Sequence, residues 1–440
     1  MAYLVGVLIL VVVLLASIAL HEAGHMVPAK KFGVRVSQYM VGFGPTLWSR
    51  TRGETEYGLK AIPLGGYTRL VGMYPPARAV GDPPADGGWA VRLAADAREA
   101  SAGEIPPGED HRAFYRLSTP KKLVVMLGGP VMNLVIAAVL LAIAYVGIGI
   151  PGSTTTIASV SQCVLPVDAS ANQACTPGDQ LAPGAAAGVQ PGDRVVSFGG
   201  TPITSWDQLT TLIRAAGGTS EPLVVERAGH QVTLQVTPAV AQRPVLDANG
   251  LPVTGADGKT KTEAAGFLGV TAAEATQRAS IASIPALVGE RTWATMKVVA
   301  TLPSQAYQVL HETVTGQPRG TSSIVGIVGV GRFAGDIASA QGDGINWGLK
   351  AAGLLEMLAA LNLSLFVFNL IPLPPLDGGH VAAALWEGLK RQAARLRKLP
   401  KPRVADTARL VPLAYTVFAI LGALGVMLIW ADIVNPVSVG

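Results

Sequence analysis

Four long apolar segments divide this chain and set its class. Residues 4–27, 123–150, 351–371 and 410–430 are dominated by aliphatic side chains. Each reaches the roughly 20 residues that a helix needs to cross a bilayer. The pattern therefore predicts a polytopic α-helical membrane protein with about four transmembrane helices.

Two regions between these segments show other patterns. Residues 36–45 and 57–62 alternate polar and apolar side chains around a turn at Arg52-Gly53, which predicts a β-hairpin associated with the cytoplasmic face of the membrane. Residues 181–238 combine short strand-like runs, a helix near 205–215 and a Pro191-Gly192-Asp193 turn. This second region resembles a PDZ domain, an α+β fold that binds the ends of extended peptides by adding a strand to its sheet.

Composition and charge fit this class. The chain is 50% hydrophobic and 14% charged, against about 25% charged residues in soluble proteins. Its lysines and arginines gather in residues 28–122 and 378–409, so the positive-inside rule assigns both loops to the cytoplasm. Residues 151–345 and both termini are then extracytoplasmic. No basic run is interleaved with aromatic residues, so nucleic acid is not an expected partner.

These patterns give a domain map. Residues 73–120 are rich in Pro, Gly and Ala without aliphatic periodicity, which predicts a disordered cytoplasmic insertion. The other predicted parts are transmembrane helix 1 (1–30), a membrane-associated β-loop (31–72), transmembrane helix 2 (121–150), the extracytoplasmic PDZ-like domain (155–275), an extracytoplasmic helical connector (276–345), transmembrane helix 3 (346–380), a basic cytoplasmic loop (381–408) and transmembrane helix 4 (409–431).

The first apolar segment carries the sequence His21-Glu22-Ala23-Gly24-His25. Residues i and i+4 share a helix face, so His21 and His25 are candidate ligands of one metal ion, with Glu22 beside them as a general base. Ionisable groups at this depth are costly and usually functional. A cleaved signal peptide is the alternative, but Met1-Ala2-Tyr3 offers no basic start and Lys30-Lys31 follow the segment.

A third candidate ligand follows the third apolar segment. Pro372, Pro374 and Pro375 end the helix, and we expect an extended backbone at Asp377. The first and third segments both run from outside to inside, so Asp377 comes to the depth of His21 and His25. Two histidines, one carboxylate and an open fourth position are typical of a catalytic zinc site, with one Zn²⁺ per chain.

Together these motifs resemble a known family. The HExxH motif in the first span, the PDZ-like domain and the N-x-x-P-x-P-x-L-D-G stretch from Asn369 to Gly378 are similar to the bacterial PDZ-containing branch of the site-2 proteases, which are M50-like peptidases. The resemblance implies a zinc-dependent intramembrane endopeptidase of the bacterial inner membrane. Its implied substrates are single-pass membrane proteins such as pre-cleaved anti-sigma factors, which it would cut by regulated intramembrane proteolysis.

The resemblance also implies individual roles. His21, His25 and Asp377 would bind zinc, and Glu22 would be the catalytic base. Asn369 would help to hold the substrate, and Gly42, Phe43 and Gly44 would belong to a membrane-associated β-loop that contacts it. The Gly128–Asn133 stretch matches a family motif that allows close helix packing.

Two other functions remain open from the sequence. One is a membrane-tethered PDZ adaptor without proteolytic activity, and the other is a zinc transporter. Intact His21, Glu22, His25 and Asp377 disfavour the adaptor. A transporter needs ligands along a path through the membrane, whereas the sequence offers one cluster at one depth.

Cys163 and Cys175 are the two cysteines of the chain. Both fall in the predicted extracytoplasmic region, where an oxidising environment favours disulfides. We predict that they form a disulfide across a loop of turn-forming residues.

Overall fold

The computed structural model describes residues 1–81, 87–164, 175–176, 178–245, 261–320, 323–341, 346–400 and 402–437. They fall into two compact units. Residues 1–149 and 278–440 form one, the membrane unit. Residues 150–277 form the other, the inserted unit.

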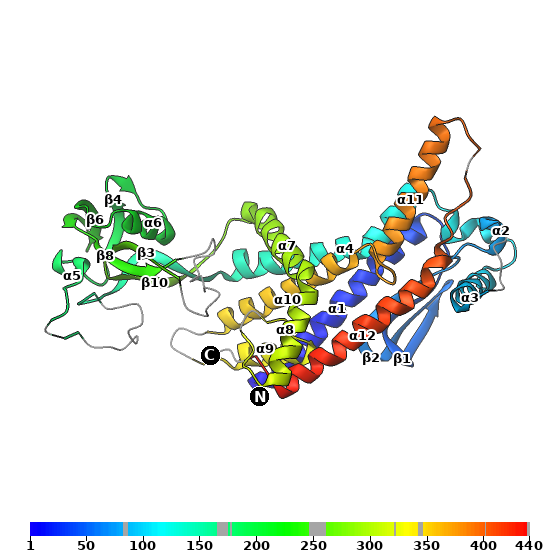
Figure 1. Ribbon diagram of the computed structural model, residues 1–440, viewed down its shortest axis with the longest axis horizontal. Helices are drawn as coiled ribbons and strands as arrows, with labels where there is room; N and C mark the ends of the chain where they lie inside the picture. The colour runs from blue at the N-terminus through cyan, green and yellow to red at the C-terminus, as the bar shows by residue number, and fades with distance from the viewer. Residues whose placement is uncertain are drawn as a thin grey trace. The chain divides into compact units, whose positions relative to one another are not determined.

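Among the described residues, four helices are long and apolar enough to cross a membrane (Figure 1). The chain is therefore a polytopic membrane protein. These helices are α1 (Ala2–Lys31), α4 (Thr119–Ala142) with its π-helical continuation η3 (Ile143–Ile148), α10 (Trp347–Asn369), and η5 (Thr407–Leu410) continued by α12 (Val411–Val434).

Apolar side chains pack α1 against its neighbours. Leu10 of α1 forms one buried cluster with Leu354 and Leu358 of α10 and with Ala334 of α9 (Ile327–Ser339). A polar pair is buried in the same interface, where the amide Nδ2 of Asn362 donates to Ser17 Oγ at 3.2 Å. The connector before α9 contains η4 (Ile281–Ser283), α7 (Ile284–Ala300) and α8 (Leu302–Thr315).

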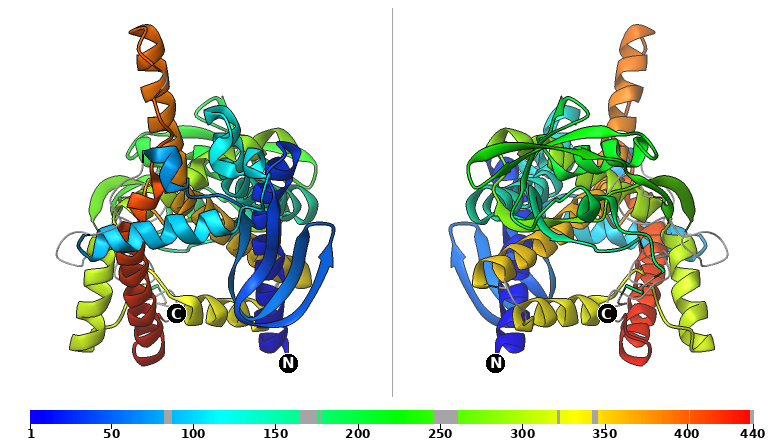
Figure 2. Two further views of the ribbon diagram at one scale, coloured as in Figure 1. Left: turned by 90° about the vertical axis from the view of Figure 1, so that its right-hand side faces the viewer. Right: turned by 90° about the vertical axis from the view of Figure 1, so that its left-hand side faces the viewer.

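A long antiparallel hairpin lies beside α1 (Figure 2). Its strands are β1 (Val36–Arg52) and β2 (Thr55–Leu70). The hydroxyl of Tyr39 donates to the carbonyl oxygen of Ala19, and that of Thr68 donates to the carbonyl oxygen of Glu22, at 2.5 and 3.1 Å. These bonds hold the hairpin next to the HExxH segment. Large apolar side chains are exposed toward its far end: Phe43, Leu47, Trp48, Leu59 and Ile62.

The expectation of a disordered insertion at 73–120 is wrong for much of that region. Residues 82–86 lie outside the described part, but α2 (Ala77–Val80), α3 (Trp89–Gly103), η1 (Asp110–Arg112) and η2 (Phe114–Arg116) flank them. Helix α3 buries Ala94, Arg98 and Ser101. Two of these three side chains are polar, so the helix shows no aliphatic stripe in the sequence.

The expected loop at 381–408 is also wrong in part, because residues 377–396 form helix α11 (Asp377–Leu396). Transmembrane helix 3 ends at Asn369, before the predicted limit of 380, and Asp377 begins the next helix where extended backbone was expected. The prolines do stop α10, but proline is well tolerated at and before a helix start, so the helix resumes after them.

Buried ion pairs hold both ends of the fourth span. Before η5, Asp406 accepts from Arg98 of α3 at 2.8 Å. At the other end, Asp432 pairs with Arg319 at 3.1 Å, and both side chains are almost completely buried. Asp432 also accepts from the backbone N–H of Gly329 at 2.8 Å, near the start of α9.

The inserted unit is built on one large antiparallel sheet and a separate antiparallel pair, β8-β9. The strand order of the large sheet is β10-β3-β4-β6-β7, with β5 paired to β4. Helix α6 (Trp206–Ala215) contributes Leu209 and Ile213 to a core that also holds Val195, Phe198 and Leu223. The remaining elements are β3 (Ile150–Val160), α5 (Pro183–Ala186), β4 (Arg194–Phe198), β5 (Thr201–Pro202), β6 (Glu221–Arg227), β7 (His230–Val236), β8 (Ala239–Pro244), β9 (Thr262–Phe267) and β10 (Val270–Gln277).

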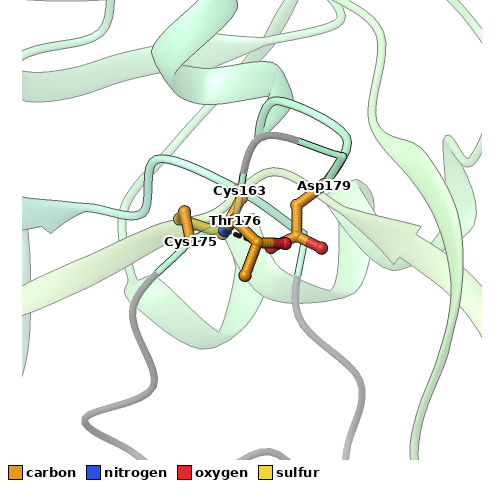
Figure 3. Close-up of a disulfide and its surroundings, with 4 residues drawn as sticks. All are labelled: Cys163, Cys175, Thr176 and Asp179. Carbon is orange, nitrogen blue, oxygen red and sulfur yellow. Dashed lines mark hydrogen bonds between the residues drawn. A yellow bond between two sulfur atoms is a disulfide. The ribbon is translucent and has the colours of Figure 1, made fainter.

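A disulfide joins Cys163 and Cys175 in this unit (Figure 3). Their Cα atoms are 5.9 Å apart. Next to the bond, the carboxylate of Asp179 accepts from the backbone N–H of Thr176 at 2.7 Å. The sheet itself is anchored by Asp193, whose pKa is lowered because it accepts hydrogen bonds from Arg227.

Candidate metal centre

Three predicted ligand side chains meet in the membrane unit. His21 Nε2 and His25 Nε2 are 3.3 Å apart, and the carboxylate oxygen Oδ2 of Asp377 lies 3.5 and 3.3 Å from them. Among the His, Cys, Asp and Glu side chains of the described residues, these three form a group close enough to share a metal ion. Residues more than 350 positions apart in the sequence thus form one cluster.

The ring of His25 is fixed by helix α4. Its Nδ1 lies 2.8 Å from the carbonyl oxygen of Val125, and a carbonyl oxygen can only accept a hydrogen bond. Nδ1 of His25 therefore carries the proton, and Nε2 keeps its lone pair toward Asp377 and His21. This is the tautomer that a metal ligand bound through Nε2 requires.

Asn133 of α4 meets the other ring. Its side-chain amide is completely buried, with the nitrogen 3.1 Å from His21 Nδ1 and the amide oxygen unpaired within the described structure. A half-turn of the amide exchanges these two atoms. The oxygen then accepts from Nδ1–H of His21, and Nε2 of His21 is again left free for a metal.

Close backbone packing makes room for this arrangement. A methyl group built on Gly128 of α4 would lie 1.9 Å from the carbonyl oxygen of Gly24 in α1, so neither helix tolerates a side chain there. A methyl group on Gly129 would lie 2.2 Å from His25 Nε2. The space that a side chain at position 129 would fill is therefore open beside the ligand atoms.

Helix α11 positions the carboxylate. Asp377 is its first residue, and Gly378 lets the helix start pack against the preceding turn, since a methyl group there would lie 2.2 Å from the carbonyl oxygen of Ile371. Further along α11, the buried Glu387 pairs with the buried Lys122 of α4 at 2.9 Å. One ion pair thus clamps the helix of Asp377 to the helix that orients both histidines.

The trio fits a tetrahedral metal such as zinc. Ligand atoms about 2.0–2.1 Å from a tetrahedral ion are about 3.3–3.4 Å from each other, close to the three spacings observed. Asp377 Oδ2 is buried and has no hydrogen-bond partner in the described structure.

The other predicted residues lie around this cluster. Glu22, on the next position of α1, is buried but is not one of the three grouped ligands. Asn369 is the last residue of α10 and is partly exposed. Gly42 and Gly44 have φ of +93° and +81°, and they bend β1 where its register with β2 shifts. Phe43 between them stacks on Tyr67 at 6.3 Å.

Comparison with known proteins decides the family. The model of peptidase family M50 matches residues 9–415. The chain belongs to peptidase family M50. This confirms the resemblance found in the sequence and makes the chain a peptidase of this family.

Curated relatives extend over almost the whole chain. It is 34% identical to zinc metalloprotease Rip1 of Mycobacterium tuberculosis over 99% of both chains. It is 31% identical to zinc metalloprotease Rip1 of Mycolicibacterium smegmatis over the full length of both. Metalloprotease MmpA of Caulobacter vibrioides is 26% identical over 89% of each chain.

The sequence does not predict the groups that orient the candidate ligands. The motif that contains Asn133 predicts close helix packing only, although an amide in an apolar span is itself a signal of a polar partner. Lys122 and Glu387 looked like ordinary loop charges. Nothing in the sequence marks the carbonyl oxygen of Val125, because every residue carries one.

Replacing Asn133 by Leu should weaken zinc binding by about 10- to 100-fold, because the ring of His21 loses its orienting acceptor. Asn133→Asp keeps an acceptor and should stay within a few-fold of the native affinity. Zinc affinity would be measured by competition with a chelator. Asn362→Leu removes another buried amide of the membrane unit and is the matched control. Native affinity in Asn133→Leu would show that His21 is oriented by other contacts.

Proposed function

We propose that this protein is a zinc-dependent intramembrane endopeptidase of the bacterial inner membrane, with one zinc ion held by His21, His25 and Asp377. The observation that carries the proposal is the tetrahedral spacing of these three ligand atoms, with both histidines on a helix apolar enough to span a membrane. Membership of family M50 and the zinc metalloproteases among its relatives support it.

Zinc bound there would lower the pKa of a water molecule and polarise a carbonyl group. The chain supplies the rest. Glu22 follows His21 directly, so its carboxylate can accept the proton of the attacking water and pass it to the leaving amine. Glu22 is only 8% exposed, which strengthens its interactions by excluding bulk water. Gly66 of β2 faces Glu22 without a side chain, and this leaves space beside the carboxylate.

We infer that the substrate is a transmembrane segment of a single-pass membrane protein, such as a pre-cleaved anti-sigma factor. A helical peptide bond is shielded by its neighbours, so the segment must unwind before it is cut. Strands β1 and β2 form a two-stranded sheet with exposed apolar side chains, which suits pairing with an extended segment in the bilayer. Gly42, Phe43 and Gly44 would contact the substrate there, and Asn369 would hold it at the end of α10.

The inserted unit is, in this proposal, an extracytoplasmic PDZ-like domain that binds peptide ends and restricts access by large substrates. The proposal is supported by the sheet of this unit, which shares a core with α6, and by the turn that contains the buried Asp193. The clustering of basic residues in 28–122 and 378–409 supports a cytoplasmic position for both of these regions. Both termini and the disulfide then lie outside.

Glu22→Gln should keep one zinc per chain and lose proteolysis by about 10²–10⁴-fold, because Gln cannot accept the proton. Zinc content and cleavage of a membrane-embedded model substrate would be measured on the same purified sample. Cleavage within about tenfold of native would exclude Glu22 as the base.

Asp377→Ala is the companion variant and should lower the bound zinc itself. If it retained a full equivalent with native affinity, Asp377 would not be a ligand. His380, three residues further along α11, would be the next candidate.

Removal of the inserted unit should leave cleavage of a short, pre-cut substrate intact and increase cleavage of a full-length one. Ile150 pairs with Gln277, so the two ends of the unit lie side by side and a short Gly/Ser linker can replace residues 152–275. Rates on both substrates would be compared with those of the native chain. Loss of activity on the short substrate in a folded, zinc-loaded protein would contradict the gating role.

Cys163 and Cys175 should resist a membrane-impermeant thiol reagent in intact cells and react after reduction by an impermeant reductant. The bond protects both sulfurs, and an extracytoplasmic position gives the reagents access. Labelling without reduction would refute the disulfide. Labelling that required a permeabilised membrane even after reduction would reverse the proposed orientation.

A further inference from the structure

A pocket of about 470 Å³ lies in the membrane unit, apart from the metal centre. Arginines from four separate segments line it. They are Arg78 of α2, Arg116 of η2, Arg391 of α11 and Arg403 in the segment between α11 and η5. Tyr115 also lines it, and its hydroxyl group donates to Asp110 at 2.6 Å.

Acidic side chains neutralise only part of this charge. Asp110 pairs with Arg116 and, at 3.8 Å, with Arg78. Glu387 pairs with Arg391 at 2.5 Å, but the same carboxylate already pairs with Lys122. Among the described residues, two carboxylates thus face five cations, and positive charge remains.

Two arginines have unused hydrogen-bonding capacity. Within the described chain, Arg403 makes no ion pair, and the buried Nε of Arg391 has no hydrogen-bond partner. A guanidinium group offers five donors in a planar fork that matches phosphate oxygens. The pocket therefore combines excess charge, free donors and room for a phosphate-bearing group.

The sequence positions of the arginines put the pocket at the membrane surface. Arg116 precedes the first residue of α4 by three positions, and Arg403 precedes Thr407, where the fourth span begins, by four. On α11, Trp386 is 60% exposed and lies under the ammonium group of Lys390, an arrangement typical of the interfacial layer. The phosphate groups of lipids lie in this layer.

We propose that this pocket binds the phosphate of an anionic phospholipid headgroup. Zwitterionic lipids carry a compensating cation that the arginines would repel, so the pocket discriminates in favour of phosphatidylglycerol and related lipids. Arg391 and the ion pair of Glu387 with Lys122 connect the pocket to the helix that carries Asp377. The bound lipid would therefore also brace α11.

The test uses the full-length protein in detergent, titrated with short-chain phosphatidylglycerol and, separately, with short-chain phosphatidylcholine. Binding would be followed by native mass spectrometry. Arg403→Gln should weaken phosphatidylglycerol binding by about fivefold, and Arg116→Gln/Arg403→Gln by about thirtyfold, from roughly 1 kcal/mol per basic residue near a lipid surface. Arg395→Gln/Arg397→Gln removes two exposed arginines at the end of α11 and should stay within twofold of native.

Three results would overturn the proposal. One is equal binding of phosphatidylglycerol and phosphatidylcholine. Another is equal weakening in the pocket variants and in the Arg395/Arg397 control. The third is full displacement of the lipid by millimolar inorganic phosphate, which would make the pocket a site for a soluble phosphate compound. Arg403 makes no ion pair with the residues that the structure describes, so Arg403→Gln removes a donor of the pocket without breaking one of their salt bridges.

Discussion

The contact between the backbones of α1 and α4 is the constraint on which the metal centre depends. Only where Gly24 meets Gly128 can the two helices come close enough for Val125 and Asn133 to reach the histidine rings. In a lipid environment there is little hydrophobic force to drive helices together, so small residues and polar contacts have to do so. The glycine contact therefore also determines which groups of α4 reach the two histidine rings and orient them.

In the membrane unit, buried charged side chains occur in pairs near the ends of the spans. Lys122–Glu387, Arg98–Asp406 and Arg319–Asp432 are buried ion pairs, and each lies at or near the end of a span. Removing one partner of such a pair costs roughly 3–5 kcal/mol, because the other charge stays buried. These pairs fix the helix ends, while the imidazole and carboxylate groups of the metal centre lie between the helices. A metal ion bound as proposed would supply the positive charge that Asp377 and Glu22 otherwise lack.

The sequence was informative where one residue type has one physical meaning. The aliphatic runs predicted the four spans. The predicted direction of the first and third spans was enough to place His21, His25 and Asp377 at the same depth. The sequence was uninformative where residues occupy positions that their type usually avoids, such as a polar side chain in a buried position. Helix α3 buries Arg98 and Ser101 in place of apolar residues, and α11 resumes directly after three prolines. Contacts to backbone atoms, such as His25 to Val125, have no signature in any pattern.

The separation of the ligands along the chain has a consequence for synthesis. His25 leaves the ribosome 352 residues before Asp377. At about 5–20 residues per second, roughly 20–70 seconds pass between the two events. If His21, His25 and Asp377 hold zinc as proposed, the first span has only two of its three ligands throughout that time. Such a protease would be unable to cut nascent membrane proteins beside it until its own translation is nearly complete.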